Sequence, residues 1–230
     1  MKNLLTFITC FFCLHTCLAQ ETVEKKNNII DDVYERYKAK IDSVGKQTII
    51  GPYTAYIRRK PVAQGQYVNG KRVGVWYYYD ANGKLMQQFD YDKNQLLFEA
   101  PVTQTSTMHY QIDYPIADSD RITIPVKIGG RYFGYLPYAL LIRKIHRLRG
   151  LDTDPCRAVL NILVSPMGRL ADCTVVLNCA GSDPVTFNVE TDGLPIEEKI
   201  FAPATYNGKP IASKIEITCH TNDSGEMSIN

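Results

Sequence analysis

The sequence lacks the local signatures of most enzymes and carries no marked excess of charge of either sign. Only four His occur among its 230 residues, and no HExxH, GxSxG, P-loop or GxGxxG spacing is present. Lys and Arg number 26 against 24 Asp and Glu, whereas a nucleic-acid-binding protein usually has a clustered basic face. We therefore expect no enzyme, no cofactor and no nucleic-acid partner.

Long apolar runs are absent after the first 19 residues. Leu4–Leu18 is mostly apolar, follows a single Lys at position 2, and is followed by Ala19 and the polar pair Gln20–Glu21. This is the layout of a secretory signal peptide over residues 1–19. A membrane anchor needs ~20 apolar residues, so a retained anchor is the less favoured alternative. We expect an exported chain with no membrane span once the leader is cleaved.

The four cysteines outside the leader form neither a metal motif nor a redox motif. Cys156, Cys173 and Cys179 lie too far apart in the sequence for a CxxC pair. Cys219 and His220 are neighbours on an expected strand, so their side chains point to opposite faces and cannot act together. A nucleophilic Cys156 with a distant His stays open, but we expect no catalytic and no metal site.

Residues 20–46 are polar and compatible with a helix. Their larger apolar residues recur at helical spacing opposite charged side chains, and Gly45 offers a C-terminal stop. These apolar residues are Ile29, Ile30, Val33, Tyr37 and Ile41. We expect a short amphipathic helix or linker that packs on the next region.

From residue 47 to residue 98 the chain changes to short β-rich runs. Tight turns are indicated at Gly51–Pro52, Asn69–Gly70, Asn82–Gly83 and Asp92–Asn94. Three motifs that begin with Tyr start 12 residues apart in this region. Strands and turns at such spacing are typical of a meander of hairpins.

The run Val73–Tyr79 carries bulky side chains on both faces of the expected strand. Trp76 and Tyr78 alternate with Val75, Tyr77 and Tyr79. A sheet this rich in aromatic residues must either stack on another element or present one aromatic face. Trp76 and Tyr78 are therefore the candidate residues of an aromatic binding face.

Residues 65–85 read GQYVNGKRVGVWYYYDANGKL. This segment resembles the MORN-type repeat, and most closely the bacterial variant in which Y-x-N-G-K-x-x-G-x-W-x-x-Y precedes N-G-K-L. The resemblance implies an array of β-hairpins over residues 47–98, with contacts to proteins or to the envelope. It does not imply catalysis.

After a polar connector over residues 99–122, regular patterns resume. Pro137 suits the first turn of a helix and Gly150 suits its end. Alternating apolar residues then predict a hairpin and one last strand. The expected elements are a helix over Gly134–Arg149, strands over Ala158–Val164, Cys173–Leu177 and Ile211–Cys219, and a flexible tail over residues 223–230.

Two motifs in this part resemble the TonB C-terminal domain. They are Ile124–Gly130 (IPVKIGG) before the helix and Phe201–Ile211 (FAPATYNGKPI) before the last strand. The resemblance covers residues 123–222 and implies a small three-stranded antiparallel sheet with a packed helix. The expected fold class is therefore α+β, an N-terminal hairpin array followed by that sheet. The expected location is the periplasm or another exported site of a bacterial cell envelope.

The resemblance also implies a sheet edge that accepts an extended peptide. The matching strand here is Ser213, Lys214, Ile215, Glu216 and Ile217. The charges of Lys214 and Glu216 give the alternative of a blunted edge. We expect a non-enzymatic module that binds an envelope protein or peptide. Two alternatives are a membrane-anchored TonB-like energy transducer for outer-membrane transport, and a binder of envelope polymer through the MORN-like aromatic face.

Export would give the cysteines outside the leader a structural use. Cys156, Cys173, Cys179 and Cys219 all lie in the C-terminal region, and disulfides persist in exported proteins. Cys173 and Cys219 share the inward parity of their strands, and folding the hairpin brings Cys156 opposite, or one step diagonal to, Cys179. We expect the disulfides Cys156–Cys179 and Cys173–Cys219, with four buried free thiols as the alternative.

Overall fold

The computed structural model describes residues 21–30, 32–102, 107–143, 156–221 and 227–228. Strands make up 58% of the described residues and helices 8%, and the strands form antiparallel sheets. The predicted α+β class is therefore wrong, and the fold is mostly β. The leader predicted over residues 1–19 lies outside the described residues.

A seven-stranded antiparallel meander forms the N-terminal part of the fold, with strands paired in chain order. The hairpin array predicted over residues 47–98 is confirmed, and the same sheet also includes residues 21–41. Its strands are β1 (Glu21–Ile30), β2 (Val33–Ile41), β3 (Gln47–Ile57), β4 (Lys60–Val68), β5 (Lys71–Tyr79), β6 (Leu85–Asp90) and β7 (Gln95–Glu99).

The helix predicted over residues 20–46 is wrong, since β1 and β2 occupy this segment. Val33, Tyr37 and Ile41 lie four residues apart, which is close to one helical turn but also an even number of strand residues. The pattern therefore suits one face of β2 equally well. β-branched and aromatic side chains favour the strand, and pairing with β3 completes the sheet.

Positive φ angles mark the reversals between strands. Asn69 and Gly70, with φ of 50° and 77°, connect β4 to β5 as predicted. Gly51–Pro52 instead lies inside β3, next to a register shift. The reversal before β4 is at Arg58 and Arg59, whose φ angles are 45° and 73°. Because neither residue is Gly or Asn, the sequence carried no turn signal there.

The C-terminal part contains a second sheet in the order β13-β12-β11-β17, with β8 and β18 both paired to β17. The predicted hairpin and last strand are confirmed as β11, β12 and β17. The strands of this sheet are β8 (Met108–Gln111), β11 (Cys156–Val164), β12 (Leu170–Cys179), β13 (Val185–Asn188), β17 (Ser213–Thr221) and β18 (Met227–Ser228). Two small sheets are formed by β10 (Val126–Lys127) with β14 (Phe201–Ala202), and by β9 (Ile122–Thr123), β15 (Ala204–Tyr206) and β16 (Lys209–Ile211).

Two segments predicted to lack regular structure contribute strands. The connector over residues 99–122 contains β8, and the tail over residues 223–230 contains β18. Both strands are short, so periodicity within them is too brief to be recognised. Their conformation comes from pairing with the longer β17.

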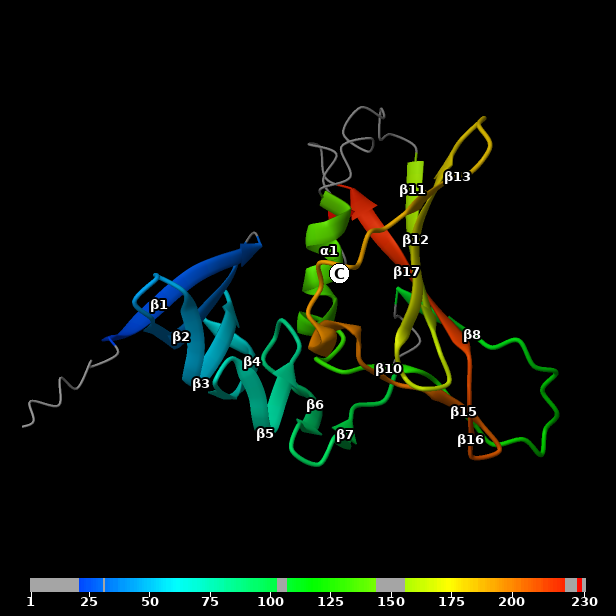
Figure 1. Cartoon of the computed structure of the whole chain (residues 1–230). Helices are drawn as coiled ribbons and strands as arrows, with labels where there is room; N and C mark the ends of the chain where they lie inside the picture. Colours follow the sequence, from blue (N-terminus) through cyan, green and yellow to red (C-terminus); the bar gives the residue numbers. More distant parts are fainter. Residues whose placement is uncertain (1–20, 31, 103–106, 144–155, 222–226, 229–230) are drawn as a thin grey trace, which may run out of the picture.

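The helical part begins with a 3-10 turn, η1 (Phe133–Tyr135), and continues as α1 (Leu136–Arg143). It confirms the start of the predicted helix, whereas residues 144–149 lie outside the described residues. A second 3-10 turn, η3 (Ile196–Lys199), precedes β14. Figure 1 shows α1 between the two large sheets, and buried side chains of both sheets and of α1 form one core cluster.

A buried amide joins the seven-stranded sheet to the segment before η1. The fully buried Gln87 of β6 accepts hydrogen bonds from the backbone N–H groups of Gly129 at 2.9 Å and Gly130 at 3.0 Å. Its amide nitrogen donates to the Lys127 carbonyl at 2.9 Å and to the Glu99 carboxylate at 2.8 Å. Both donors and both acceptor sites of the Gln87 amide are thereby paired, which holds the segment before η1 against the sheet.

Candidate binding cleft

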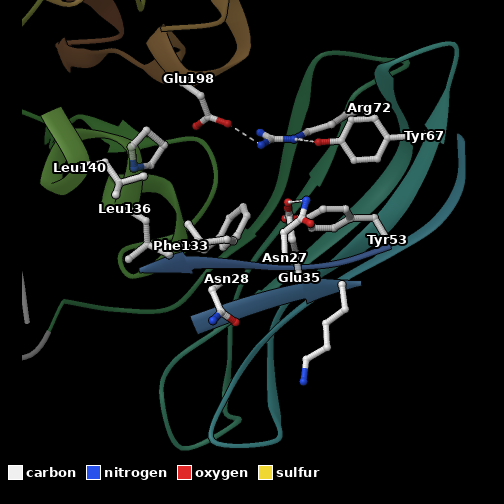
Figure 2. A pocket seen from close by; sticks show the side chains of 13 residues that line it. Asn27, Asn28, Glu35, Tyr53, Tyr67, Arg72, Phe133, Leu136, Leu140 and Glu198 are labelled. Carbon is white, nitrogen blue, oxygen red and sulfur yellow. Dashed lines mark hydrogen bonds and ion pairs between the residues drawn. The ribbon is translucent and has the colours of Figure 1, made fainter. Parts of the chain in front are cut away.

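A cleft of about 820 Å³ lies between the seven-stranded sheet and the helical segment, a volume typical of ligand-binding pockets. The sheet supplies mostly polar and aromatic side chains and the helical segment mostly apolar ones, which face each other in Figure 2. The sheet wall includes Asn27, Ile29, Glu35, Tyr53, Tyr67 and Arg72, and the opposite wall includes Phe133, Leu136, Pro137, Leu140 and Glu198.

Hydrogen bonds order the sheet wall around one carboxylate. The Tyr53 hydroxyl donates to Glu35 Oε2 at 2.7 Å, and the Asn27 amide donates to Glu35 Oε1 at 3.4 Å and to the Tyr37 hydroxyl at 2.6 Å. Burial and the nearby Glu35 carboxylate raise the pKa of Tyr53 well above its usual range. Tyr53 therefore stays a neutral hydrogen-bond donor at ordinary pH.

A buried ion pair closes one end of the cleft. Arg72 of β5 pairs with Glu198 of η3, and the two side chains are 7% and 10% exposed. Figure 2 shows Arg72 and Glu198 reaching toward each other from opposite walls. Arg72 also donates to the hydroxyls of Tyr67 at 3.2 Å and Tyr91 at 3.1 Å. Because its donors are engaged on several sides, Arg72 links the two walls.

The edge of β1 borders the cleft. Four consecutive residues, 26–29, line it, whereas one face of a strand would supply only every second residue. No strand in the described part of the chain pairs with the outer edge of β1, so alternate N–H and C=O groups point outward without a strand partner. The charged residues of β1, which blunt such an edge, are confined to positions 21–26, and Asn27–Ile30 carry none.

The predicted partner-binding strand is not a free edge. β17 pairs with β11 on one side, from Ser213 to Cys219, and with β8 on the other, from Lys214 to Ile217. Ile215 and Ile217 are fully buried. The prediction failed because alternation shows which side chains face inward but not which strands lie on either side.

The predicted aromatic binding face is also wrong. Trp76 and Tyr78 are both 0% exposed. Their side of the sheet therefore packs on another element and does not present an aromatic face to solvent. The Tyr78 ring stacks on Phe133 of η1 with centroids 6.1 Å apart. The Trp76 ring lies 5.4 Å from that of Tyr53. These side chains pack against Tyr53 and Phe133, which line the cleft, and do not offer a surface to a ligand.

The predicted Cys173–Cys219 disulfide is wrong, because both cysteines are buried free thiols. β11 lies between their strands, with Cys173 opposite Ile162 and Cys219 opposite Ala158. Two strand spacings of about 4.8 Å and a four-residue offset exceed the ~7 Å between Cα atoms that a disulfide permits. Burial raises the pKa of Cys173 to about 12 and that of Cys219 to about 11.

Cys179 is disulfide-bonded, which excludes four free thiols, and Cys156 lies opposite it in the ladder. We expect alkylation of the denatured, unreduced protein to modify Cys173 and Cys219 completely. Peptide mapping should recover Cys156 and Cys179 only as a linked pair, because their register suits a bridge. A linked peptide containing Cys173 and Cys219 would contradict this assignment.

A buried lysine next to the cleft gives a prediction on pH. Lys127 is 3% exposed, and its Nζ donates a hydrogen bond to the Ile128 carbonyl at 2.7 Å. Burial lowers the pKa of Lys127 to about 8, although the nearby Glu198 carboxylate acts to raise it. The unfolded chain retains this proton up to about pH 10.4. The unfolded state therefore binds more protons between these values, and the free energy of unfolding contributed by Lys127 rises with pH by about 2 kcal/mol from pH 8 to pH 10.

Urea denaturation of wild type and Lys127→Met at pH 8, 9 and 10 measures this contribution. Wild type should gain about 2 kcal/mol relative to the variant over this range. The raised pKa values of Cys173 and Cys219 act in the opposite direction, but they are common to both proteins and cancel in the difference. A difference that stays constant with pH would contradict the prediction.

The described residues hold no group of three or more His, Cys, Asp or Glu side chains suited to a metal ion. Within the same ranges, no helix has the length and apolar character to cross a membrane. Comparisons with family models, with curated proteins and with solved structures find no match for this chain.

Sequence reasoning missed the polar residues of the cleft. Arg72 shares the strand parity of Trp76 and Tyr78 on β5, and this parity could have placed it on the inner face. Glu198 carries no such signal, because it lies in a single 3-10 turn. The pairing of Arg72 with Glu198 could not be predicted, because the two residues are distant in the sequence and come into contact only in the folded chain.

Proposed function

We propose that this protein is a non-enzymatic module of the cell envelope that binds an extended peptide by β-strand addition. The peptide pairs with the outer edge of β1 and lies in the cleft beside α1. The observation that carries this proposal is the lining of the cleft by four consecutive residues of β1. Added strands of this kind gain affinity from main-chain hydrogen bonds and specificity from alternate side chains.

The chemistry of the walls indicates which peptide fits. Leu136 and Leu140 present an apolar surface, which suits apolar side chains at alternate positions of the peptide. Glu35 has two donors at its carboxylate, and a carboxylate can accept about four hydrogen bonds. We therefore propose a peptide with alternating apolar residues and one Lys or Arg that reaches Glu35.

The ionisable groups of the cleft support binding over catalysis. Arg72 is paired with Glu198, and Glu35 accepts a hydrogen bond from Tyr53 at 2.7 Å. The Arg72–Glu198 pair therefore positions the walls, and the acceptor capacity that remains at Glu35 serves the cationic side chain of the peptide in this proposal.

Export of the chain is part of the same proposal. It rests on the apolar run Leu4–Leu18 and the polar residues that follow Ala19. N-terminal sequencing of the protein purified from its own cells should begin at Gln20. If Met1 were intact, the proposal of a cleaved and exported module would be wrong, and the alternative of a retained membrane anchor would take its place.

Selection of a phage library of random 12-residue peptides against the full chain tests the binding site. We expect enriched peptides that slow hydrogen exchange of the β1 amides. Leu140→Asp should weaken these peptides at least tenfold, because it places a charge on the apolar wall, which loses about 1.4 kcal/mol or more of binding free energy. The matched control is Leu163→Asp on β11, a residue that is 41% exposed and does not line the cleft.

Three results would overturn the proposal. One is the absence of any enriched peptide after selection. A second is equal binding of the selected peptides to Leu140→Asp and to wild type, without protection of β1 amides. Loss of binding in both variants would also count against the cleft, because Leu163 lies on a different sheet.

A further inference from the structure

The outer face of the seven-stranded sheet, opposite the face that carries Trp76 and Tyr78, forms a continuous polar and aromatic platform. One row of directly paired residues crosses all seven strands, and residues opposite each other in a ladder share a face. None of them is buried. The row is Lys26, Arg36, Thr54, Gln64, Tyr77, Gln88 and Phe98.

The β1–β2 end of this platform is basic. The exposed side chains of Lys26, Arg36, Lys38 and Lys40 lie on this face, and Glu24 is the carboxylate that accompanies them. The Glu24–Lys38 contact is long, at 3.9 Å between Lys38 Nζ and Glu24 Oε1. The surface is hollowed here by about 500 Å³, and this hollow is lined by Glu24, Lys25, Lys26, Arg36, Tyr37, Lys38, Pro52 and Thr54. An excess of three positive charges around a hollow favours an anionic ligand.

Aromatic rings lie among these cations and continue beyond them. Tyr34 and Tyr56 stack with centroids 5.1 Å apart, and Lys26 Nζ lies 4.5 Å from the Tyr34 ring. At the other end of the row, Tyr77 is 39% exposed and Phe98 is 41% exposed. Exposed rings of this kind can stack on flat apolar surfaces such as the faces of sugar rings.

We propose that this face binds an acidic polysaccharide. Its carboxylates would pair with Lys26, Arg36 and Lys38, and its sugar rings would lie on Tyr77 and Phe98, with amide and hydroxyl groups of the row between them. Six strand spacings of about 4.8 Å give a platform about 29 Å wide, which suits a chain and not a small anion.

The distribution of charge favours a polysaccharide over two other polyanions. Nucleic acid and an anionic bilayer present negative charge along their whole surface. From Thr54 to Phe98, however, the row carries amides, a hydroxyl and aromatic rings without a cation. The platform and the peptide cleft lie on opposite faces of the sheet and share Lys26 at the edge of β1. The other six residues of the row do not line the cleft, so the platform does not depend on the function proposed above.

Calorimetric titration with polygalacturonate, with neutral dextran as reference, tests this site. We expect binding of polygalacturonate that weakens as salt rises, because exposed charges are screened, and no comparable binding of dextran. The variant Arg36→Gln/Lys38→Gln should lose about tenfold in affinity, and Tyr77→Ser/Phe98→Ser should lose affinity without a change in salt dependence. The matched control, Lys46→Gln/Lys84→Gln, removes the same charge at two exposed turns and should bind as wild type.

Each opposing result overturns the proposal. An equal loss in the control variant would show that net charge alone drives binding. Binding of polygalacturonate that is unchanged in Arg36→Gln/Lys38→Gln would place the site elsewhere. Tighter binding to a 20-nucleotide DNA strand, or to vesicles containing anionic lipid, would assign the face to a different polyanion.

Discussion

Replacing Arg72 with methionine is expected to lower the free energy of unfolding by about 3 to 5 kcal/mol, because it leaves the buried carboxylate of Glu198 without its cation. Both side chains are nearly inaccessible, at 7% and 10% exposure. The hydroxyls of Tyr67 and Tyr91 would also lose a donor. Urea denaturation followed by circular dichroism gives the difference in free energy.

Two comparisons separate the buried pair from a general effect of charge removal. Adding Glu198→Gln to Arg72→Met should restore part of the stability, since the second change removes the uncompensated charge. Arg58→Met breaks an exposed pair with Asp32, whose side chains are 80% and 61% exposed, and should cost less than about 1 kcal/mol. Similar losses for Arg72→Met and Arg58→Met would contradict the importance of burial.

Replacing Gly65 with alanine should destabilise the protein by about 3 kcal/mol. A Cβ atom at this position would lie 2.2 Å from two carbons of the Trp76 ring, so either the ring or the β4 backbone must move. Overpacking of this kind typically costs 1 to 3 kcal/mol, and contact with the rigid indole places it at the upper end. Trp76 is the single tryptophan, so its fluorescence reports both the displacement of the ring and the loss of stability.

Gly193→Ala is the matched control for this change. A Cβ atom at Gly193 would meet no atom within 4 Å, so the substitution should leave stability nearly unchanged or raise it slightly. An emission spectrum and stability of Gly65→Ala equal to those of wild type would show that the sheet yields freely at this position. That result would contradict the close packing of Trp76 over Gly65.

The hairpins could be predicted because their information is local. Asn69–Gly70 adopts positive φ angles at low cost, and the strand alternation between turns is visible over a few residues. The reversal at Arg58–Arg59 could not be predicted, since both residues adopt positive φ without the side chains that favour it. Its conformation follows from the pairing of β3 with β4.

The candidate sites illustrate a different limit. Alternation correctly indicated that Ile215 and Ile217 share one face of the last strand, but the neighbour β8 comes from a polar connector far away in the sequence. The free edge lies instead on β1, in a segment predicted to be helical. Which edge is left without a pairing strand depends on the order of all strands in a sheet. The sequence of a single strand does not determine that order.

The amino-acid sequence by itself determined the positions of most hairpins, the C-terminal hairpin with its last strand, and the absence of local catalytic motifs. These properties depend on residues close together in the chain. Only the tertiary structure decided that Trp76 and Tyr78 are buried, that Arg72 meets Glu198, and that β1 borders a cleft. Those outcomes require two sheets and a helix to share one core, and the free energy of that packing comes from contacts between segments that are distant in the sequence.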